Sequence, residues 1–236
     1  MGVASEEMPE CPNCGKPQPL CICDSITPLD NRIALLILQH PQEQDRALGT
    51  ARLTALHLKN SVLKIGLSWP SLSKALGRPV EDPKRWAVLY LGSAKAPGLD
   101  PEREIVAIDR KGEVEDHQRA ILKEIEGIVL LDGTWSQAKA LWWRNAWMLK
   151  CQRVILNPAK PSLYGKLRRE PRREGLATIE AAAMLLAGLE KRPDIAATLN
   201  AAFERMLARY REAQAVLPEL GPKPRPKRDY RRRKRA

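Results

Sequence analysis

Long hydrophobic runs are missing from this chain of 236 residues. No stretch of about 18 consecutive apolar residues occurs, so we expect no membrane-spanning helix. Residues 1–7 are acidic and lack an apolar core, which argues against a secretory signal. We therefore expect a cytoplasmic protein without a membrane partner, in which residues 1–10 are a disordered N-terminus.

Two glycine-rich phosphate-binding motifs are also missing. No Gly-x-Gly-x-x-Gly follows a predicted strand, and the sequence contains no Gly-x-x-x-x-Gly-Lys. These absences argue against a Rossmann dinucleotide site and against a P-loop.

Apolar residues are plentiful and follow a regular order. They make up 44% of the sequence, which is enough for a sizeable core. Aliphatic runs alternate with helix-like segments over residues 32–217, which predicts an α/β domain with a mostly parallel sheet flanked by helices. We predict strands at 33–38, 62–67, 86–91, 105–108, 128–131 and 154–156, and helices at 45–58 (with Asp45 as N-cap), 117–125, 136–149, 178–189 and 193–217.

A polar cluster follows one of the predicted strands. The apolar run 127–131 ends in Asp132, Gly133, Thr134 and Trp135, directly before a predicted helix. Ligands of open α/β sheets bind outside the carboxyl ends of the strands, so a carboxylate, a hydroxyl and an aromatic ring here indicate a reactive site. The alternative is that Asp132 caps the helix and Trp135 packs in the core.

Four cysteines stand close together near the N-terminus. Cys11, Cys14, Cys21 and Cys23 lie within thirteen residues that also contain glycine and proline. This spacing suits a structural zinc ion held by four thiolates in a small module, residues 11–31. Redox-active cysteines or a loop without metal are the alternatives. Cys151 stands alone and is expected to pack in the core.

Positive charge is concentrated at the C-terminus. The net charge is +12, and residues 221–236 alone carry nine Lys or Arg and one Asp. Like charges and prolines oppose folding, so we expect residues 218–236 to form a basic disordered tail that contacts the phosphates of a nucleic acid. A solubilising extension is the alternative.

Further basic residues lie inside the domain. Residues 166–174 carry five basic and two acidic groups and lead into a second motif, 178–181. We therefore favour contacts to RNA phosphates or a cofactor carboxylate over a merely solvated loop. Trp143 and Trp147 could form a base-stacking face, although core packing of at least one is the stronger expectation. The candidate RNA-binding residues are Arg46, Arg168, Arg169, Arg172 and Arg173.

The order of these motifs resembles the DTW-domain family. Asp132, Thr134 and Trp135 match its Asp-x-Thr-Trp signature, with Gly133 at the variable position and with a serine and alanines in the helix that follows. Further matching segments are 40–53, beginning His-Pro-Gln-Glu, then 167–168 and 175–181, together with the cysteine cluster. Several motifs in one order are far more specific than any one of them.

The resemblance implies both a fold and an activity. Family members are tRNA-uridine aminocarboxypropyltransferases related to SPOUT methyltransferases, so a SPOUT-like sheet with a C-terminal knot is implied. They transfer the 3-amino-3-carboxypropyl group of S-adenosylmethionine to N3 of a uridine, in bacterial members within the tRNA variable loop. Such a site uses loops after the C-terminal strands, and the implied cofactor-binding residues are Leu91, Gly92, Ser93, Leu156, Asn157, Thr178 and Glu180.

The expected chemistry is a displacement at carbon. Asp132 would accept or orient the N3 proton if partial burial raises its pKa, Thr134 would fix the loop, and Trp135 would stack on uracil or cofactor. His40 also follows a predicted strand, but a lone histidine is more often structural. Two other functions stay open: a SPOUT-type RNA methyltransferase, and a non-catalytic zinc-containing RNA-binding protein.

Overall fold

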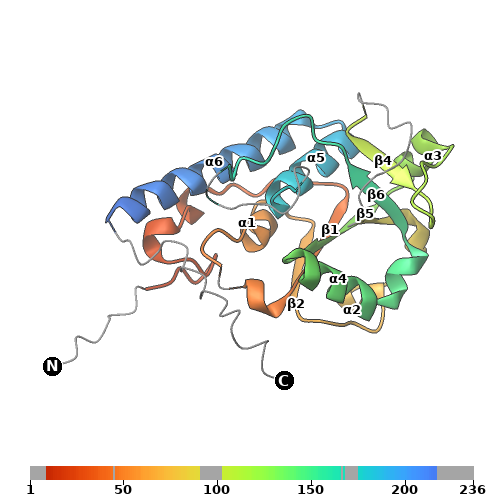
Figure 1. The fold of residues 1–236 in the computed structure, drawn as a ribbon, viewed down its shortest axis with the longest axis horizontal. Helices are drawn as coiled ribbons and strands as arrows, with labels where there is room; N and C mark the ends of the chain where they lie inside the picture. The colour runs from red at the N-terminus through yellow and green to blue at the C-terminus, as the bar shows by residue number, and fades with distance from the viewer. Residues whose placement is uncertain (1–8, 45, 91–102, 166, 168–174, 217–236) are drawn as a thin grey trace, which may run out of the picture.

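A six-stranded sheet forms the centre of the computed structural model, which describes residues 9–44, 46–90, 103–165, 167 and 175–216 (Figure 1). The strand order is β2-β1-β5-β3-β6-β4. Neighbouring strands are parallel except for β4, which runs antiparallel to β6. The strands are β1 (Ala34–Gln39), β2 (Ser61–Ile65), β3 (Trp86–Leu89), β4 (Ile105–Ile108), β5 (Gly127–Asp132) and β6 (Gln152–Leu156).

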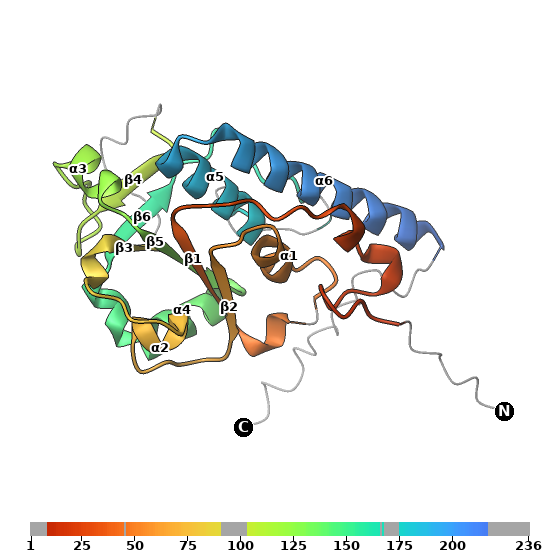
Figure 2. The ribbon, with the colours of Figure 1, turned by 180° about the vertical axis from the view of Figure 1, so that it is seen from behind.

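Helices cover both faces of the sheet, which confirms the predicted α/β architecture (Figures 1 and 2). One face carries α1 (Ala51–Leu56), α5 (Thr178–Glu190) and α6 (Pro193–Val216), and the opposite face carries α2 (Leu72–Leu76) and α4 (Trp135–Arg144). The short helix α3 (Gln118–Lys123) lies beside β4. The described residues also form five 3-10 turns: η1 (Gln18–Leu20), η2 (Cys23–Ser25), η3 (Pro41–Glu43), η4 (Pro83–Arg85) and η5 (Ala146–Lys150).

Strand β1 shows how the two layers of the core arise. Its side chains alternate between the faces of the sheet. Leu35 and Ile37 belong to the apolar cluster shared with α1, α5 and α6. Leu36 and Leu38 belong to the cluster shared with α2 and η5. The strand is buried along its whole length, as the continuous aliphatic run predicts for a central parallel strand.

The predicted helix 45–58 is wrong in its first half. The chain forms η3, a turn, and then α1 with Thr50 at the N-cap position, while Asp45 lies outside the described residues. In that turn the carbonyls of residues 47–49 accept hydrogen bonds from two distant side chains, Lys16 and Tyr164. Because Lys16 and Tyr164 bind these carbonyls, the carbonyls are not available for the backbone hydrogen bonds of a helix.

The predicted helix 136–149 also ends early. Asn145 donates its side-chain amide to the carbonyls of Leu141 and Leu67 and accepts from the Trp69 N–H. The chain leaves α4 there and continues as η5. The short helix α2 was not predicted, although Ser71 caps its N-terminus and Gly77, at φ 84°, ends it.

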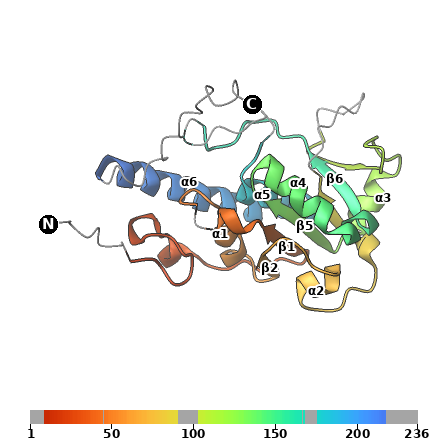
Figure 3. The same ribbon diagram turned by 60° about the horizontal axis from the view of Figure 1, so that its bottom comes forward.

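The N-terminal cysteine segment packs against the long helix α6, as Figure 3 shows. Leu20 joins Tyr210 and Ala213 in a small apolar cluster. An ion pair of 3.2 Å between Arg209 and Asp24 lies beside it. The cysteine segment is therefore held by the C-terminal half of the domain. None of the helices in the described ranges is long and apolar enough to cross a membrane.

Candidate active site and cysteine cluster

Asp132 is held at the carboxyl edge of the sheet by two side chains. It is the last residue of β5 and lies directly opposite Gln39, the last residue of β1. The Gln39 amide donates to Oδ2 of Asp132 at 2.9 Å. The hydroxyl of Thr178, at the start of α5, donates to Oδ1. Each carboxylate oxygen therefore has one donor and keeps a lone pair for a ligand.

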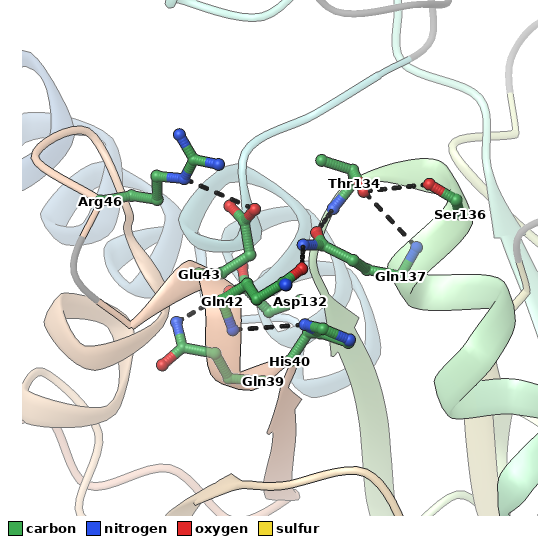
Figure 4. Close-up of polar contacts among 9 residues, drawn as sticks. All are labelled: Gln39, His40, Gln42, Glu43, Arg46, Asp132, Thr134, Ser136 and Gln137. Carbon is green, nitrogen blue, oxygen red and sulfur yellow. Dashed lines mark hydrogen bonds and ion pairs between the residues drawn. The ribbon is translucent and has the colours of Figure 1, made fainter. Parts of the chain in front are cut away.

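Thr134, and not Asp132, caps helix α4 (Figure 4). The Gln137 N–H donates to the Thr134 hydroxyl at 3.4 Å, and the Thr134 N–H donates to the Gln137 side-chain oxygen at 2.5 Å. This reciprocal pair is a capping box. The alternative in which Asp132 serves as the helix cap is therefore wrong, and its carboxylate is oriented by other elements.

Gly133 lies in a crowded position between these two residues. A Cβ atom added there would lie 2.9 Å from Cβ of Gln137 and 3.4 Å from Cβ of His40. A side chain at the variable position of the motif would therefore displace the capping residue Gln137.

His40 and Gln42 close the other side of the site. The ring Nδ1 of His40 accepts from the Gln42 N–H at 3.3 Å, and Gln42 accepts from the Gln137 amide at 3.2 Å. The His40 N–H donates to the Asp132 carbonyl at 2.9 Å. These bonds tie η3 to the loop after β5 and give His40 a structural role.

Trp135 begins α4 and is half-buried. The Lys139 ammonium lies 5.5 Å from the centre of its ring. This distance is within cation–π range. A ligand that contacts the indole would therefore lie close to a positive charge.

Glu180, a residue of the second motif, orders the loop before α5. Its carboxylate accepts from the Ser162 hydroxyl at 2.5 Å and from the N–H groups of Leu163 and Ala177, each at 2.8 Å. Glu180 is only 7% exposed. These contacts fix the neighbouring Tyr164, whose hydroxyl donates to the Leu48 carbonyl at 2.6 Å.

The remaining cofactor-binding candidates follow β3 and β6. Leu91, Gly92 and Ser93 lie outside the described residues. Leu156 ends β6, and the next residue, Asn157, donates its N–H to the Glu104 carbonyl at 2.9 Å. Because β5, β3 and β6 are parallel neighbours, their carboxyl ends lie at one edge of the sheet.

The RNA-binding candidates fall into two groups. Arg46 is 60% exposed at its side chain, and its Nε lies 3.7 Å from a carboxylate oxygen of the buried Glu43. Trp143 is 78% exposed, whereas Trp147 is buried and donates to the Trp69 carbonyl. Core packing of at least one tryptophan is thus confirmed. The other four arginines, Arg168, Arg169, Arg172 and Arg173, lie outside the part of the chain that the structure describes.

Sequence reasoning missed Gln39 and Lys16. Gln39 is a polar residue at the end of an aliphatic strand, which is the pattern that identified Asp132. Lys16 follows the first cysteine pair, yet it is only 6% exposed. Burial lowers its pKa to about 8, while the neighbouring charges of Cys14 and Asp132 oppose this shift. Nothing in the sequence pattern marks this lysine as buried.

The four N-terminal cysteines converge, as a metal site requires. Their Sγ atoms all lie within 4.8 Å of one another, and Cys11 and Cys23 are 3.8 Å apart. Zinc–sulfur bonds of about 2.3 Å in a tetrahedron place the sulfurs about 3.8 Å apart, so the donor set fits zinc. A hydrogen bond from the Cys14 N–H is the main cause that lowers the pKa of Cys11 to about 6, whereas burial raises the pKa of Cys14 and of Cys23. A bound metal ion would have to stabilise the thiolates of the latter two.

Cys151 lies apart from this cluster and is buried. Burial raises the pKa of its thiol to about 12. The residue packs as expected from its isolation in the sequence.

The chain thus combines an α/β domain, an oriented carboxylate at the carboxyl edge of a parallel sheet, and a cluster of four cysteines. The model of the DTW domain family matches residues 8–211, and the chain belongs to this family.

Curated relatives share the match over most of this chain. A Mus musculus protein named tRNA-uridine aminocarboxypropyltransferase 2 is 32% identical over 202 residues, which cover 83% of this chain and 61% of the relative. A Drosophila melanogaster protein of the same name is 31% identical over 194 residues, covering 80% and 70%. The chain thus spans about three-fifths of the length of the first of these relatives. No solved structure gives a significant match.

Proposed function

We propose that this protein transfers the 3-amino-3-carboxypropyl group of S-adenosylmethionine to N3 of a uridine in tRNA, within the variable loop, and releases methylthioadenosine. The observation that carries the proposal is the carboxylate of Asp132, held by Gln39 and Thr178 at the end of β5 in a chain of the DTW-domain family. The name of the relatives, which specifies an aminocarboxypropyl transfer to tRNA uridine, supports it.

In this mechanism Asp132 is the base. S-adenosylmethionine supplies an electrophilic methylene carbon next to its sulfonium. The free lone pairs of the Asp132 carboxylate accept the N3 proton, the N3–carbon bond forms as the carbon–sulfur bond breaks, and the electron pair of that bond leaves with sulfur. Gln39 and Thr178 orient the carboxylate so that little reorganisation is needed when the proton moves.

We propose that the loops after β3, β5 and β6 hold S-adenosylmethionine. Leu91, Gly92 and Ser93 follow β3, and Leu156 and Asn157 follow β6. The parallel pairing of β5 with β3 and of β3 with β6 supports this placement, because it brings the carboxyl ends of the three strands to one edge. Thr178 and Glu180 then act by orienting Asp132 and by fixing the loop at residues 162–164.

Helix α4 offers a surface for the tRNA partner. Trp143 projects from it with 78% exposure, and no acidic residue occurs between residues 135 and 150. Lys139, Arg144 and Lys150 are exposed on the same stretch. An exposed ring among positive charges suits stacking on an unpaired base beside phosphates. Arg46 and the arginines at 168, 169, 172 and 173 complete the proposed RNA-binding set.

We further propose a SPOUT relationship with a C-terminal knot, and a cytoplasmic location. The strand order supports the first of these, because the late strand β5 is inserted between β1 and β3, and β6 between β3 and β4. Insertion of late strands into an existing sheet is what a chain that passes back through its own fold requires.

Labelled S-adenosylmethionine tests the activity directly. The purified protein is incubated with tRNA and with donor labelled either in the carboxyl group or in the methyl group. Carboxyl label recovered in a modified uridine is the expected result. Methyl label in the RNA would identify a methyltransferase instead, and no transfer together with no donor binding by calorimetry would indicate a non-catalytic RNA-binding protein.

A further inference from the structure

The turn between η3 and α1 is held by side chains from two remote segments. The Lys16 ammonium donates to the carbonyls of Ala47 at 2.6 Å and Gly49 at 2.9 Å. The Tyr164 hydroxyl donates to the carbonyl between them, that of Leu48, at 2.6 Å. Three consecutive carbonyls of residues 47–49 thus depend on donors outside their own segment.

Lys16 is at the same time part of the cysteine loop. Its carbonyl accepts from the Cys11 N–H at 2.8 Å, and the Gly15 N–H donates to the Cys11 carbonyl at 2.8 Å. The backbone of Lys16 is therefore set by the turn that presents the first two thiols, while its side chain reaches across to residues 47–49. The lysine is only 6% exposed, so its ammonium is confined to this position.

Hydrogen bonds also link the turn at residues 46–50 to the Asp132 site. It carries the exposed Arg46 at one end. At the other end the Thr50 hydroxyl accepts from the Ile179 N–H at 3.3 Å. Ile179 is the neighbour of Thr178, which donates to the Asp132 carboxylate.

We propose that Lys16 is a positioning residue for the transfer reaction, which couples the four-cysteine loop to the turn at residues 46–50 and through it to Thr178 and Asp132. The inference rests on the proposed function. In this inference the cysteine cluster affects catalysis indirectly. The folded cysteine loop positions the buried ammonium of Lys16, and this ammonium fixes the turn at residues 46–50 beside the site.

Lys16→Met tests the inference, because methionine fills a similar volume but carries neither charge nor donors. We expect kcat for transfer to tRNA to fall about tenfold or more, in line with the sensitivity of catalysis to small misplacements. Zinc content should equal that of the unaltered protein. Lys16→Arg keeps a charge and donors and should recover part of kcat. If only packing mattered, methionine would be tolerated better than the larger arginine.

Two control variants keep the test decisive. The exposed Lys59→Met should leave kcat unchanged. Tyr164→Phe removes the donor to Leu48 without touching the cysteine loop, and it should lower kcat in the same direction, which covers the case in which Lys16→Met does not fold. Lys16→Met with kcat within about threefold of the unaltered enzyme, or a loss fully reversed by added zinc, would overturn the inference. An unaltered protein that transfers nothing would instead refute the proposed function.

Discussion

At the scale of single residues, different polar side chains near the end of β5 cap the following helix and orient the Asp132 carboxylate. Thr134 and Gln137 cap α4, whereas Asp132 takes no part in the capping box. Gln39 and Thr178 hold the Asp132 carboxylate from two other elements. The Asp132 carboxylate is therefore oriented by other elements and is not used to cap the helix that follows it. Such a carboxylate is suited to receive a proton from a ligand.

Asp132→Asn tests this assignment, because asparagine keeps the shape and can still bond to Gln39 and Thr178 but does not accept a proton at neutral pH. We expect turnover to fall on the order of 10²-fold or more, the range for removal of a general base. Affinities for S-adenosylmethionine and tRNA should stay within a few-fold. Raising the pH should restore part of the rate, since solvent then deprotonates more of the uridine.

Steady-state kinetics over a range of pH measures this outcome. Near-normal turnover of Asp132→Asn at neutral pH would show that the carboxylate is structural. Thr178→Val provides a comparison, because it leaves the carboxylate in place and removes only the donor to Oδ1.

At the scale of elements, the proposals concern two segments that do not belong to the sheet. The cysteine segment is anchored on α6 and on the turn at residues 46–50. Helix α4 starts at the Asp132 loop and presents Trp143 to solvent. In the proposed function, the cysteine segment positions the turn beside the site and α4 contacts the tRNA.

For the cysteine segment, Cys14→Ser should lower both zinc content and melting temperature, because the remaining three thiolates bind the ion less tightly. Metal analysis and thermal unfolding measure the two effects. Cys151→Ser is the matched comparison, since Cys151 lies apart from the cluster and its loss should leave zinc content unchanged. A metal-free preparation with full stability and activity would refute the zinc hypothesis.

For helix α4, Trp143→Ala should weaken tRNA binding by a factor that corresponds to about 1–3 kcal/mol, the range for one base stacked on an aromatic side chain. Trp143→Phe keeps a ring and should lose less. Binding of S-adenosylmethionine should not change in either variant. Equal tRNA affinities for Trp143→Ala and the unaltered protein, measured at one salt concentration, would remove α4 from the RNA-binding surface.

At the scale of the whole molecule, the proposed reaction site and the most basic segment belong to different parts of the sequence. The parallel strands β1, β5, β3 and β6 have their carboxyl ends at one edge of the sheet. Much of the net charge of +12 lies instead in residues 221–236, outside the described part of the chain. Positive charge in this segment is expected to increase the affinity for tRNA without taking part in the reaction.

Removal of residues 221–236 should therefore weaken tRNA binding and flatten its dependence on salt, because fewer counterions are released on binding. The affinity for S-adenosylmethionine should be unaffected. Titrations at several salt concentrations compare the two slopes. If the truncated protein binds tRNA as tightly and with the same slope, the tail serves solubility only.

Local residue patterns were enough to predict the strands and the chemistry available to them. Aliphatic runs located the six strands of the described residues within about two residues of their observed ends. The continuous run of β1 reflects burial on both faces, whereas β2, at the edge of the sheet, is only partly buried and has the weaker run. The Asp132 cluster and the four cysteines were visible because unusual residue types stand close together along the chain.

Which side chains meet depends instead on how the elements pack. Thr178 is 46 residues from Asp132, and Lys16 is 31 residues from Ala47. The turn at residues 46–50 has a helix-like sequence, but its carbonyls are taken by Lys16 and Tyr164. Periodicity reports which face of an element is apolar. It carries no information on hydrogen bonds between segments far apart in the chain, because strand order and helix docking create those bonds.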